Sequence, residues 1–279
     1  MKVAHLSDIH FGRIAHPFIV EDLVREVNTE GVDLVAVSGD LTQRARRAQF
    51  EAARAMLEAF EAPTLVVPGN HDVVAWWHRP WTRIFDPLHR YRTFISDDLN
   101  PSFVKDGLAV LGINSAYGLT IKGGRITGEA LKAIRTFFGG QPPGIFKVLV
   151  VHHHLTKLQA LGPHDVARRA RRTLAASAEA GVDLILCGHL HISHIEPLDI
   201  VPGKHRIVIA SAGTATSNRG RRGHRDTNFY NLVSVTPEAF VIEERRYVPE
   251  RRRFVTDGTV RFERAGGGGD PVAAAGPEP

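Results

Sequence analysis

Residues 31–40 read GVDLVAVSGD, and the same form returns at residues 181–190 as GVDLILCGHL. Each stretch opens with Gly-Val-Asp-Leu, continues as a short apolar run, and then reaches a glycine followed by a polar residue. Short apolar runs are typical of strands buried on both faces, and ligand sites gather just past the carboxyl ends of such strands. The pattern therefore predicts two buried strands that each deliver a polar side chain, Asp40 and His189.

Strands and helices are predicted to alternate around these two stretches. Apolar runs predict further strands at 2–7, 64–70, 108–114 and 146–154, and helical spacing of apolar residues predicts helices at 17–29, 48–60, 128–138 and 166–180. This alternation is typical of parallel βαβ units. The last third instead reads as successive strands at 205–211, 228–235 and 239–248. We expect one α/β domain over residues 1–264, with two packed sheets, helices outside and a more antiparallel (α+β) second half. A low-complexity stretch over 265–279 is predicted to be a disordered tail.

Composition narrows the class of protein. With 279 residues, of which 43 % are hydrophobic and 23 % charged, the chain is typical of ordinary soluble globular proteins. It has no run of about 18 apolar residues, so we expect no transmembrane segment, and its start shows no apolar signal region. Cys187 is the only cysteine, so no internal disulfide can form. A reducing compartment, and thus a cytoplasmic location, is expected.

The formal net charge of +5 comes mostly from arginine clumps at 44–47, 168–172 and 219–225. Such patches suit nucleic acid, an anionic membrane surface or a phosphorylated small molecule, but solvated helix faces explain them equally simply. No added DNA-binding domain is visible, so we expect no stable nucleic-acid partner. Segment 74–95 holds all three tryptophans with several arginines. It either stacks a base or sugar over a site or packs as an amphipathic segment on the sheets.

Asp, Asn and His side chains follow five of the predicted strands. They are Asp8 and His10, Asp40, Asn70 with His71 and Asp72, the histidines 152–154, and His189 with His191. Carboxylate, imidazole and amide oxygen suit divalent metals such as Mn, Fe, Zn or Co. The i, i+2 spacing of Asp8/His10 and of His189/His191 points both side chains the same way in extended chain. Glycines 39, 69 and 188 allow the backbone to turn and approach an ion closely. A zinc knuckle at Cys187 is disfavoured, because the paired spacing of such sites is missing.

The ordered motifs D-x-H, GD, GNHD, H and GHLH over residues 8–191 resemble those of the calcineurin-like metallophosphoesterase superfamily. The stretch GDLT at 39–42 looks most like its small bacterial phosphodiesterases, which include cyclic-nucleotide enzymes. The resemblance implies a four-layer αββα sandwich with two mixed β-sheets and two bound divalent metal ions. It implies a first metal held by Asp8, His10 and His191, a second held by Asn70, His152 and His189, and Asp40 as the bridge. The family commonly shows two histidines and a proline where this chain reads HHHL, so a register shift would make His153 the ligand instead.

The resemblance also implies a reaction. Two metal ions can hold a bridging hydroxide that attacks phosphorus in line with the leaving group. His71 stands beside the ligand Asn70 and is the expected general acid, while Asp72 either orients it or caps the next segment. We expect a small phosphodiester as substrate, with cyclic nucleotides included. The alternatives are a UDP-diacylglucosamine-type pyrophosphate and, in another class, a non-catalytic metal-binding scaffold; the retained His71 and full ligand set argue against the scaffold.

Overall fold

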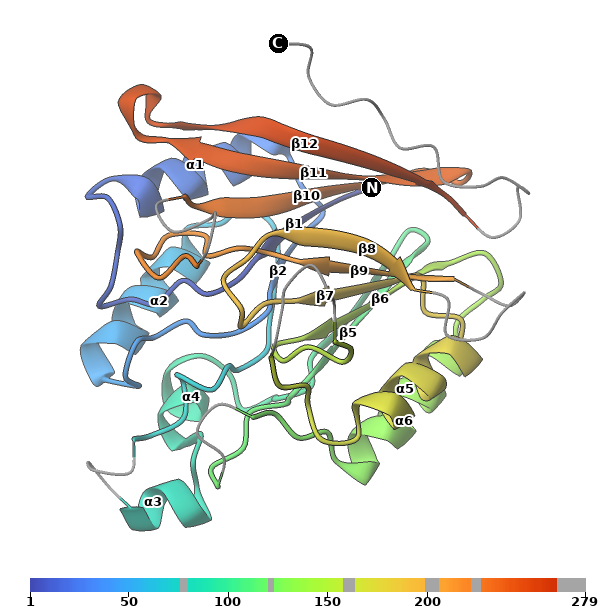
Figure 1. Ribbon diagram of the computed structural model, residues 1–279, viewed down its shortest axis with the longest axis horizontal. Coiled ribbons are helices and arrows are strands. Elements are labelled where there is room, and N and C mark those ends of the chain that lie inside the picture. Colours follow the sequence, from blue (N-terminus) through green and yellow to red (C-terminus); the bar gives the residue numbers. More distant parts are fainter. Residues whose placement is uncertain (76–79, 120–122, 158–163, 199–205, 222–226, 265–279) are drawn as a thin grey trace.

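The computed structural model describes residues 1–264 apart from 76–79, 120–122, 158–163, 199–205 and 222–226 (Figure 1). The predicted tail over 265–279 lies outside the described residues. In the described part, the chain builds two six-stranded sheets, of which the first has the order β12-β11-β10-β1-β2-β3. Its strands are β1 (Lys2–Leu6), β2 (Leu34–Val37), β3 (Thr64–Val66), β10 (Phe229–Val235), β11 (Ala239–Val248) and β12 (Arg253–Glu263). Strands β1, β2 and β3 run parallel, whereas β10, β11 and β12 pair antiparallel.

The second sheet has the order β4-β5-β6-β7-β9-β8. Its strands are β4 (Ser102–Lys105), β5 (Leu108–Ile113), β6 (Phe146–Val151), β7 (Leu184–Cys187), β8 (His194–Leu198) and β9 (Ile207–Ser211). The four central strands β5, β6, β7 and β9 are parallel, and the two edge strands are antiparallel to their neighbours. Both sheets are therefore mixed, as expected.

The described helices lie outside the two sheets (Figure 1). They are α1 (Ile19–Glu30), α2 (Arg47–Glu58), α3 (Pro80–Phe85), α4 (His89–Phe94), α5 (Gly128–Gly139) and α6 (Ala170–Glu179), and a 3-10 turn spans Pro249–Arg251. All of these α-helices except α3 contribute to an apolar cluster with one sheet. Among the described helices, none combines the length and the apolar character that a membrane span requires.

Three apolar clusters hold the layers together. One joins α1, α2 and α4 to the first sheet, one fills the space between the two sheets, and one joins α5 and α6 to the second sheet. Strand β1 serves two of them, because alternate side chains face opposite sides: Val3 faces the second sheet, whereas Ala4 and Leu6 face the helices. The expectation of a four-layer αββα sandwich is confirmed.

The structure differs from the sequence prediction mainly at sheet edges. Strands β4, β8 and β12 were not expected. In β4 and β12 many side chains are exposed, and β8 contains Pro197. Edge strands tolerate charge and proline, so they lack the apolar run that identifies a buried strand. Helix α6 begins at Ala170 instead of 166, because Arg169 before it adopts a left-handed backbone (φ 69°).

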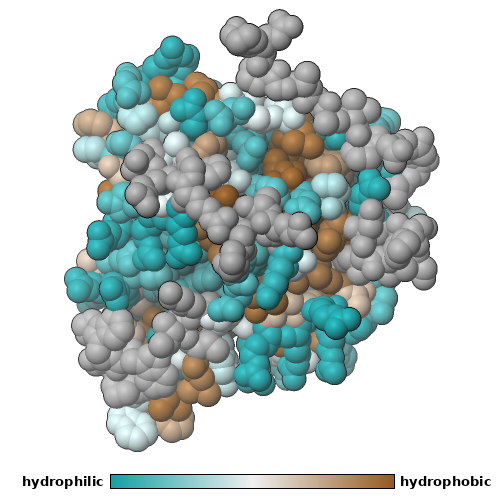
Figure 2. Space-filling view, viewed as in Figure 1, coloured by the Kyte–Doolittle hydropathy of each residue, from teal (hydrophilic) through white to brown (hydrophobic). Residues whose placement is uncertain are grey.

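Segment 74–95 forms α3 and α4, except for residues 76–79, which lie outside the described part. Arg83 is buried and donates to the carbonyl oxygens of Val74 and Gly118, so it anchors the segment. Trp81 and Phe85 are 72 % and 79 % exposed and stack on each other. Figure 2 shows apolar side chains at the surface over α3, in keeping with those exposures.

A buried carboxylate ties α1 to the last two strands. The side chain of Asp22 is fully buried and accepts hydrogen bonds from Tyr247 Oη at 2.6 Å and Arg252 Nη2 at 2.9 Å. Arg25 Nη2 donates to the same carboxylate at 2.6 Å. Burial opposes the charge, but hydrogen bonds from Arg252, Tyr247 and Arg25 outweigh it and lower the pKa of Asp22 below its ordinary value.

We predict that Asp22→Asn lowers the free energy of unfolding by about 1–3 kcal/mol near neutral pH, because three donors lose an ionised acceptor. The folded-state pKa lies below the unfolded-state value, so the carboxylate stabilises the fold above about pH 4 and loses this contribution as the pH falls. Urea denaturation should show a lower free energy of unfolding for Asp22→Asn than for the wild type, and this difference should shrink in acid. Glu58→Gln, which breaks the exposed pair with Arg54, should cost under about 0.5 kcal/mol. Equal losses in the two variants would contradict the prediction.

Candidate metal centre

Five parallel strands from the two sheets end at one place. Strands β1, β2 and β3 of the first sheet and β6 and β7 of the second are each followed by polar residues, as the sequence predicted. A hydrogen bond joins the two sheets here, because His189 N, after β7, donates to Asp8 Oδ2, after β1, at 2.8 Å. Within the second sheet, Gly188 N donates to His152 O at 3.1 Å. The polar strand ends therefore meet in one cluster.

The first group of side chains offers ligand atoms within 4.8 Å of one another; its members are Asp8, His10, Asp40 and His191. Asp8 Oδ1 lies 3.0 Å from His191 Nε2 and 3.5 Å from His10 Nε2. The two imidazole nitrogens, His10 Nε2 and His191 Nε2, are 3.2 Å apart. All four residues are buried.

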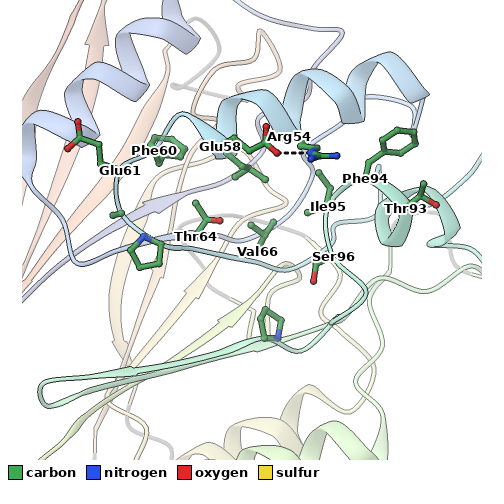
Figure 3. A pocket seen from close by; sticks show the side chains of 14 residues that line it. Arg54, Glu58, Phe60, Glu61, Thr64, Val66, Thr93, Phe94, Ile95 and Ser96 are labelled. Atoms are coloured by element: carbon green, nitrogen blue, oxygen red, sulfur yellow. Dashed lines mark hydrogen bonds and ion pairs between the residues drawn. The ribbon is translucent and has the colours of Figure 1, made fainter.

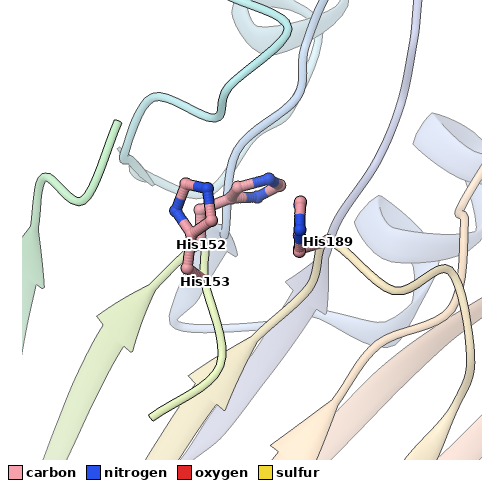
Figure 4. Close-up of side chains that lie close together, drawn as sticks. All are labelled: His152, His153 and His189. Atoms are coloured by element: carbon pink, nitrogen blue, oxygen red, sulfur yellow. The ribbon is translucent and has the colours of Figure 1, made fainter. Parts of the chain in front are cut away.

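The second group consists of His152, His153 and His189, again within 4.8 Å (Figure 4). Asn70 Oδ1 lies among them, 3.1 Å from His152 Nε2 and 2.9 Å from His189 Nδ1. Asp40 Oδ2 stands between the groups, 3.5 Å from His152 Nε2 and 3.6 Å from His10 Nε2. Every residue predicted as a metal ligand is thus in the cluster.

Backbone carbonyl groups set the orientation of the imidazole rings. Nδ1–H of His152 donates to Ser38 O at 2.7 Å, and Nδ1–H of His10 donates to Thr42 O at 3.3 Å. Nδ1–H of His191 donates to the carbonyl oxygen of Arg219 at 2.7 Å. A carbonyl oxygen only accepts, so each Nδ1 carries a proton, and in the neutral ring each Nε2 is the acceptor that faces the cluster.

The cluster consequently brings acceptors against acceptors. His10 Nε2 and His191 Nε2 face each other at 3.2 Å, and Asp8 Oδ1 and Asp40 Oδ2 are buried without a hydrogen-bond partner. Unsatisfied buried acceptors are costly unless a cation binds them. Two donors about 2.1 Å from one ion lie roughly 3.0–3.4 Å apart, close to the observed spacings. The donor set therefore fits divalent metal ions, and the two groups could hold a pair of them.

The charges of the cluster residues also suit the binding of metal ions. Burial opposes ionisation of Asp8, yet the surrounding histidines, His191 first, hold the pKa of Asp8 well below its usual range. The pKa of Asp40 is also lowered, because the nearby His152, His71 and His10 outweigh the effect of its burial. Burial lowers the pKa of His189 far below its ordinary value. Ionised carboxylates with a neutral imidazole are the protonation states in which these groups bind metals.

The backbone of the cluster is strained. Left-handed backbone costs a non-glycine residue about 1–3 kcal/mol and persists only where the surroundings enforce it. Among the described residues, nine non-glycine residues have positive φ, and five belong to the cluster. They are Asp8 (52°), His10 (51°), Asp40 (54°), His189 (72°) and His191 (58°). Concentrated strain of this kind points to a functional site.

His71 and Asp72 lie beside the cluster in different roles. His71 is in neither group of ligand atoms; its Nδ1–H donates to Gln43 O at 2.8 Å, and its ring packs edge-on against His10. Asp72 accepts from Gly69 N at 2.9 Å and Thr42 N at 2.9 Å, and its hydrogen bonds go to these loops and not to the His71 ring. Burial, followed by Asp40, raises the pKa of Asp72 to about 7. Asp72 therefore ties the Asp40 loop to the loop after β3.

Gly188 is required because neighbouring side chains pack too close to its Cα for a Cβ to fit; its φ is not in the left-handed region. A Cβ at this position would lie 1.8 Å from Ser7 Oγ and 2.6 Å from Asp8 Oδ2. Gly39, by contrast, has φ 93° and also packs against Gly69 and His152. The sequence predicted that these glycines let the backbone approach an ion; at Gly188 the structure shows a close approach to the side chains of Ser7 and Asp8.

A separate pocket of about 710 Å³ opens near the amino end of β3, at the opposite end of that strand from Asn70. Side chains of α2 and of residues 93–96 line it, and the ion pair Arg54–Glu58 crosses its wall (Figure 3). It contains none of the cluster residues. The metal centre is therefore defined by its donor atoms and not by this pocket.

Comparisons with known proteins agree with the fold and the cluster. A family model described as calcineurin-like phosphoesterase matches residues 1–193. The chain is 28 % identical over 250 residues to "Glycerophosphodiester phosphodiesterase GpdQ" of Enterobacter lignolyticus, covering 84 % of each protein.

Two solved structures share the fold at low sequence identity. A purple acid phosphatase from yellow lupin (Lupinus luteus) seeds superposes with a TM-score of 0.68 at 12 % identity, covering 95 % of this chain and 54 % of that one. A dimetal phosphatase from Danio rerio gives 0.61 at 13 % identity, covering 92 % and 98 %. This chain therefore spans about half of the lupin enzyme and nearly all of the fish enzyme.

We predict that Gly188→Ala empties the metal centre without unfolding the protein, because the added methyl group displaces the Asp8 carboxylate. Elemental analysis after purification should show at least half of the metal lost, with the far-UV circular dichroism unchanged. Gly128→Ala at the start of α5 is the matched control, since a Cβ there meets nothing within 4 Å. Full metal content in Gly188→Ala would refute the packing argument.

Proposed function

Because the chain belongs to the calcineurin-like phosphoesterase family and is a metal-dependent phosphoester hydrolase, we propose that it hydrolyses a small phosphodiester at a two-metal centre. One observation carries the proposal: the buried carboxylate atoms Asp8 Oδ1 and Asp40 Oδ2 have no hydrogen-bond partner and lie 3.0–3.6 Å from imidazole nitrogens of the cluster. When bound, two divalent cations supply the positive charge that activates water and neutralises the phosphate.

The first ion would be held by Asp8, His10 and His191, and the second by Asn70, His152 and His189. Asp40 would bridge them, since its Oδ2 lies between His10 Nε2 and His152 Nε2. Mn, Fe, Zn and Co all suit this mixture of imidazole, carboxylate and amide oxygen. The assignment of the bridge rests on this central position.

His152, and not His153, is the proposed ligand. His152 Nε2 faces Asn70 Oδ1 and Asp40 Oδ2, whereas His153 directs Nδ1 to the hydroxyl of Ser115 at 2.7 Å. The Nε2 atom of His153 is buried without a partner and lies in the same group of ligand atoms. Of the two rings, His152 is the one with a nitrogen within 4 Å of the Asp40 carboxylate, and this proximity favours it as the ligand.

His71 is the proposed general acid. Its Nδ1 is occupied by Gln43 O, which leaves Nε2 as the atom that can carry a proton to the leaving oxygen. Burial lowers the pKa of His71, and Asp40 offsets this only partly. A negatively charged phosphate beside the ring raises that pKa again and favours the protonated form. Asp72 supports this arrangement as a positioning residue, because it fixes the loops that carry Asp40 and His71.

The substrate is proposed from chemistry and from the relatives. The Enterobacter relative is named a glycerophosphodiester phosphodiesterase, which supports a small phosphodiester as the substrate here. Cyclic nucleotides are included among the proposed substrates because they are small phosphodiesters. A pyrophosphate of the UDP-diacylglucosamine type is the alternative within the same chemistry. A non-catalytic scaffold is disfavoured, because the cluster keeps its donors and His71 beside them. Residues 1–264 are proposed as one domain, and the buried free thiol of Cys187 accords with a cytoplasmic location.

We predict that chelation of the metals abolishes hydrolysis of bis(p-nitrophenyl) phosphate, and that reloading with single ions restores it. Asp40→Ala should lose both metals and activity, since it removes the shared ligand. Asp257→Ala, an exposed partner of Arg246, serves as the control. Two metals retained in Asp40→Ala by elemental analysis would refute the bridge, and metal-independent hydrolysis would refute the proposed function. A panel of cyclic nucleotides, glycerophosphodiesters, pyrophosphates and a phosphomonoester would then rank the substrates.

For His71→Ala we predict full metal content with turnover of an alkyl phosphodiester reduced by about 10²–10⁴. An aryl ester should be affected less, because p-nitrophenolate leaves without a proton. Steady-state kinetics on the two esters measures the difference. Full activity on the alkyl ester would remove His71 from the role.

A further inference from the structure

A chain of buried hydrogen bonds leads from the first sheet to the ring of His152. Nδ1–H of His152 donates to the carbonyl oxygen of Ser38 at 2.7 Å. The hydroxyl of the same Ser38 lies 2.9 Å from Nε2 of His5, and Nδ1 of His5 lies 3.3 Å from Nδ2 of Asn231. All four residues are fully buried. The chain therefore begins on β10, crosses β1 and the end of β2, and reaches the second sheet at His152.

The direction of these bonds follows from the amide group of Asn231. An amide nitrogen only donates, so Nδ1 of His5 accepts and Nε2 of His5 carries the proton. Nε2–H then donates to the hydroxyl of Ser38, which itself donates to the carbonyl oxygen of Leu6 at 3.5 Å. Burial lowers the pKa of His5 to about 3 against the opposing charge of Asp8. The ring is therefore neutral near pH 7 and keeps this pattern of bonds.

His5 occupies a position that packing alone would fill with an apolar side chain. It shares one face of β1 with Val3, which packs between the two sheets. Both ring nitrogens of His5 are nevertheless paired, one with Asn231 and one with Ser38. A fully paired polar group in the interior fixes the geometry of its partners. The partner nearest the metal centre is Ser38, whose N–H is also held by Leu6 O at 2.9 Å.

The two proposed metal sites depend on this chain unequally. The ring of His152, in the second site, is oriented by Ser38 O. The rings of the first site are oriented by other carbonyl groups: His10 by Thr42 O and His191 by Arg219 O. Within the described part of the chain, the side chain of His5 hydrogen-bonds to Ser38 and Asn231 alone. A change at His5 should therefore reach the second site and spare the first.

We propose that His5 is a positioning residue for the second metal ion: by holding the hydroxyl of Ser38, it fixes the carbonyl oxygen that orients the His152 ring. The proposal rests on the function proposed above and adds to that site a residue outside the donor set. Loss of a group that orients a metal-binding histidine typically lowers metal affinity about 10–100-fold. His5 acts one bond further from the metal, so we expect the lower end of this range, about tenfold.

The test titrates the metal-free full chain with Mn²⁺ by calorimetry. His5→Leu, which keeps a similar volume and removes the donor, should weaken one of the two Mn²⁺ binding steps about tenfold and change the other less than about twofold. His5→Gln should restore affinity to within about threefold of the wild type, because its amide can both donate to Ser38 and accept from Asn231. The Mn²⁺ concentration that gives half-maximal hydrolysis of bis(p-nitrophenyl) phosphate should rise in parallel, with kcat at saturating Mn²⁺ changed less.

Two further variants identify the affected ion and exclude simple destabilisation. Asn70→Ala removes a proposed ligand of the second ion, so adding His5→Leu to it should leave the affinity for the remaining ion unchanged. Leu232→Ala lies on β10 next to Asn231 but packs toward the helices. It should lower the urea midpoint through the cavity it creates and leave both Mn²⁺ affinities as in the wild type.

Each outcome decides. Unchanged affinities in His5→Leu, equal weakening of both steps, the same loss in Leu232→Ala, or no recovery in His5→Gln would overturn the proposal, while the proposed function would stand. A wild type that binds fewer than two Mn²⁺ ions would overturn the proposed function itself. Where His5→Leu fails to fold, Ser38→Ala replaces it, because that variant removes the hydroxyl and keeps the carbonyl. Unchanged Mn²⁺ affinities in Ser38→Ala would then overturn the proposal.

Discussion

The short loop at residues 38–43 is the element on which the metal centre depends. Its backbone carbonyl groups accept Nδ1–H from three imidazoles, those of His152, His10 and His71. The same loop carries Asp40 between the two groups of donors. A single backbone segment therefore sets the central carboxylate and the ring orientations around it. Asp72 fixes this loop through its backbone N–H groups, so a buried carboxylate outside the donor set holds the geometry.

The cluster stores free energy that a cation would release. Two carboxylates with lowered pKa values lie fully buried, and imidazole nitrogens point toward them from several sides. Left-handed backbone at five of these positions adds strain. The rest of the fold must offset these costs, and the three apolar clusters of the sandwich are the available source. Bound metal would neutralise the repulsion and stabilise the folded state by the linkage that any native-state ligand obeys.

The sequence predicts those parts of the molecule that leave a signal in side chains. Apolar runs such as 34–37 and 184–187 are buried in parallel sheets, and the polar residues after them meet as expected. Edge strand β8, with Pro197 in it, leaves no such signal. The partners that orient the rings also escape prediction, because Ser38, Thr42 and Gln43 act through backbone carbonyls that every residue possesses. The sequence predicted two alternative roles for Asp72 and could not choose between them, since its partners are backbone N–H groups.

The cluster also draws its donors from both sheets, which links the core to the chemistry. Asp8 and Asp40 follow strands of the first sheet, whereas His152 and His189 follow strands of the second. The distance between them is set by side chains packed between the sheets, such as Val3, Leu34 and Val148. Gly188 allows the closest approach, where His189 N reaches the carboxylate of Asp8 across the two sheets. Because a packed core transmits changes of even one methylene, the spacing of the proposed metal pair is a property of the sandwich and not of the loops alone.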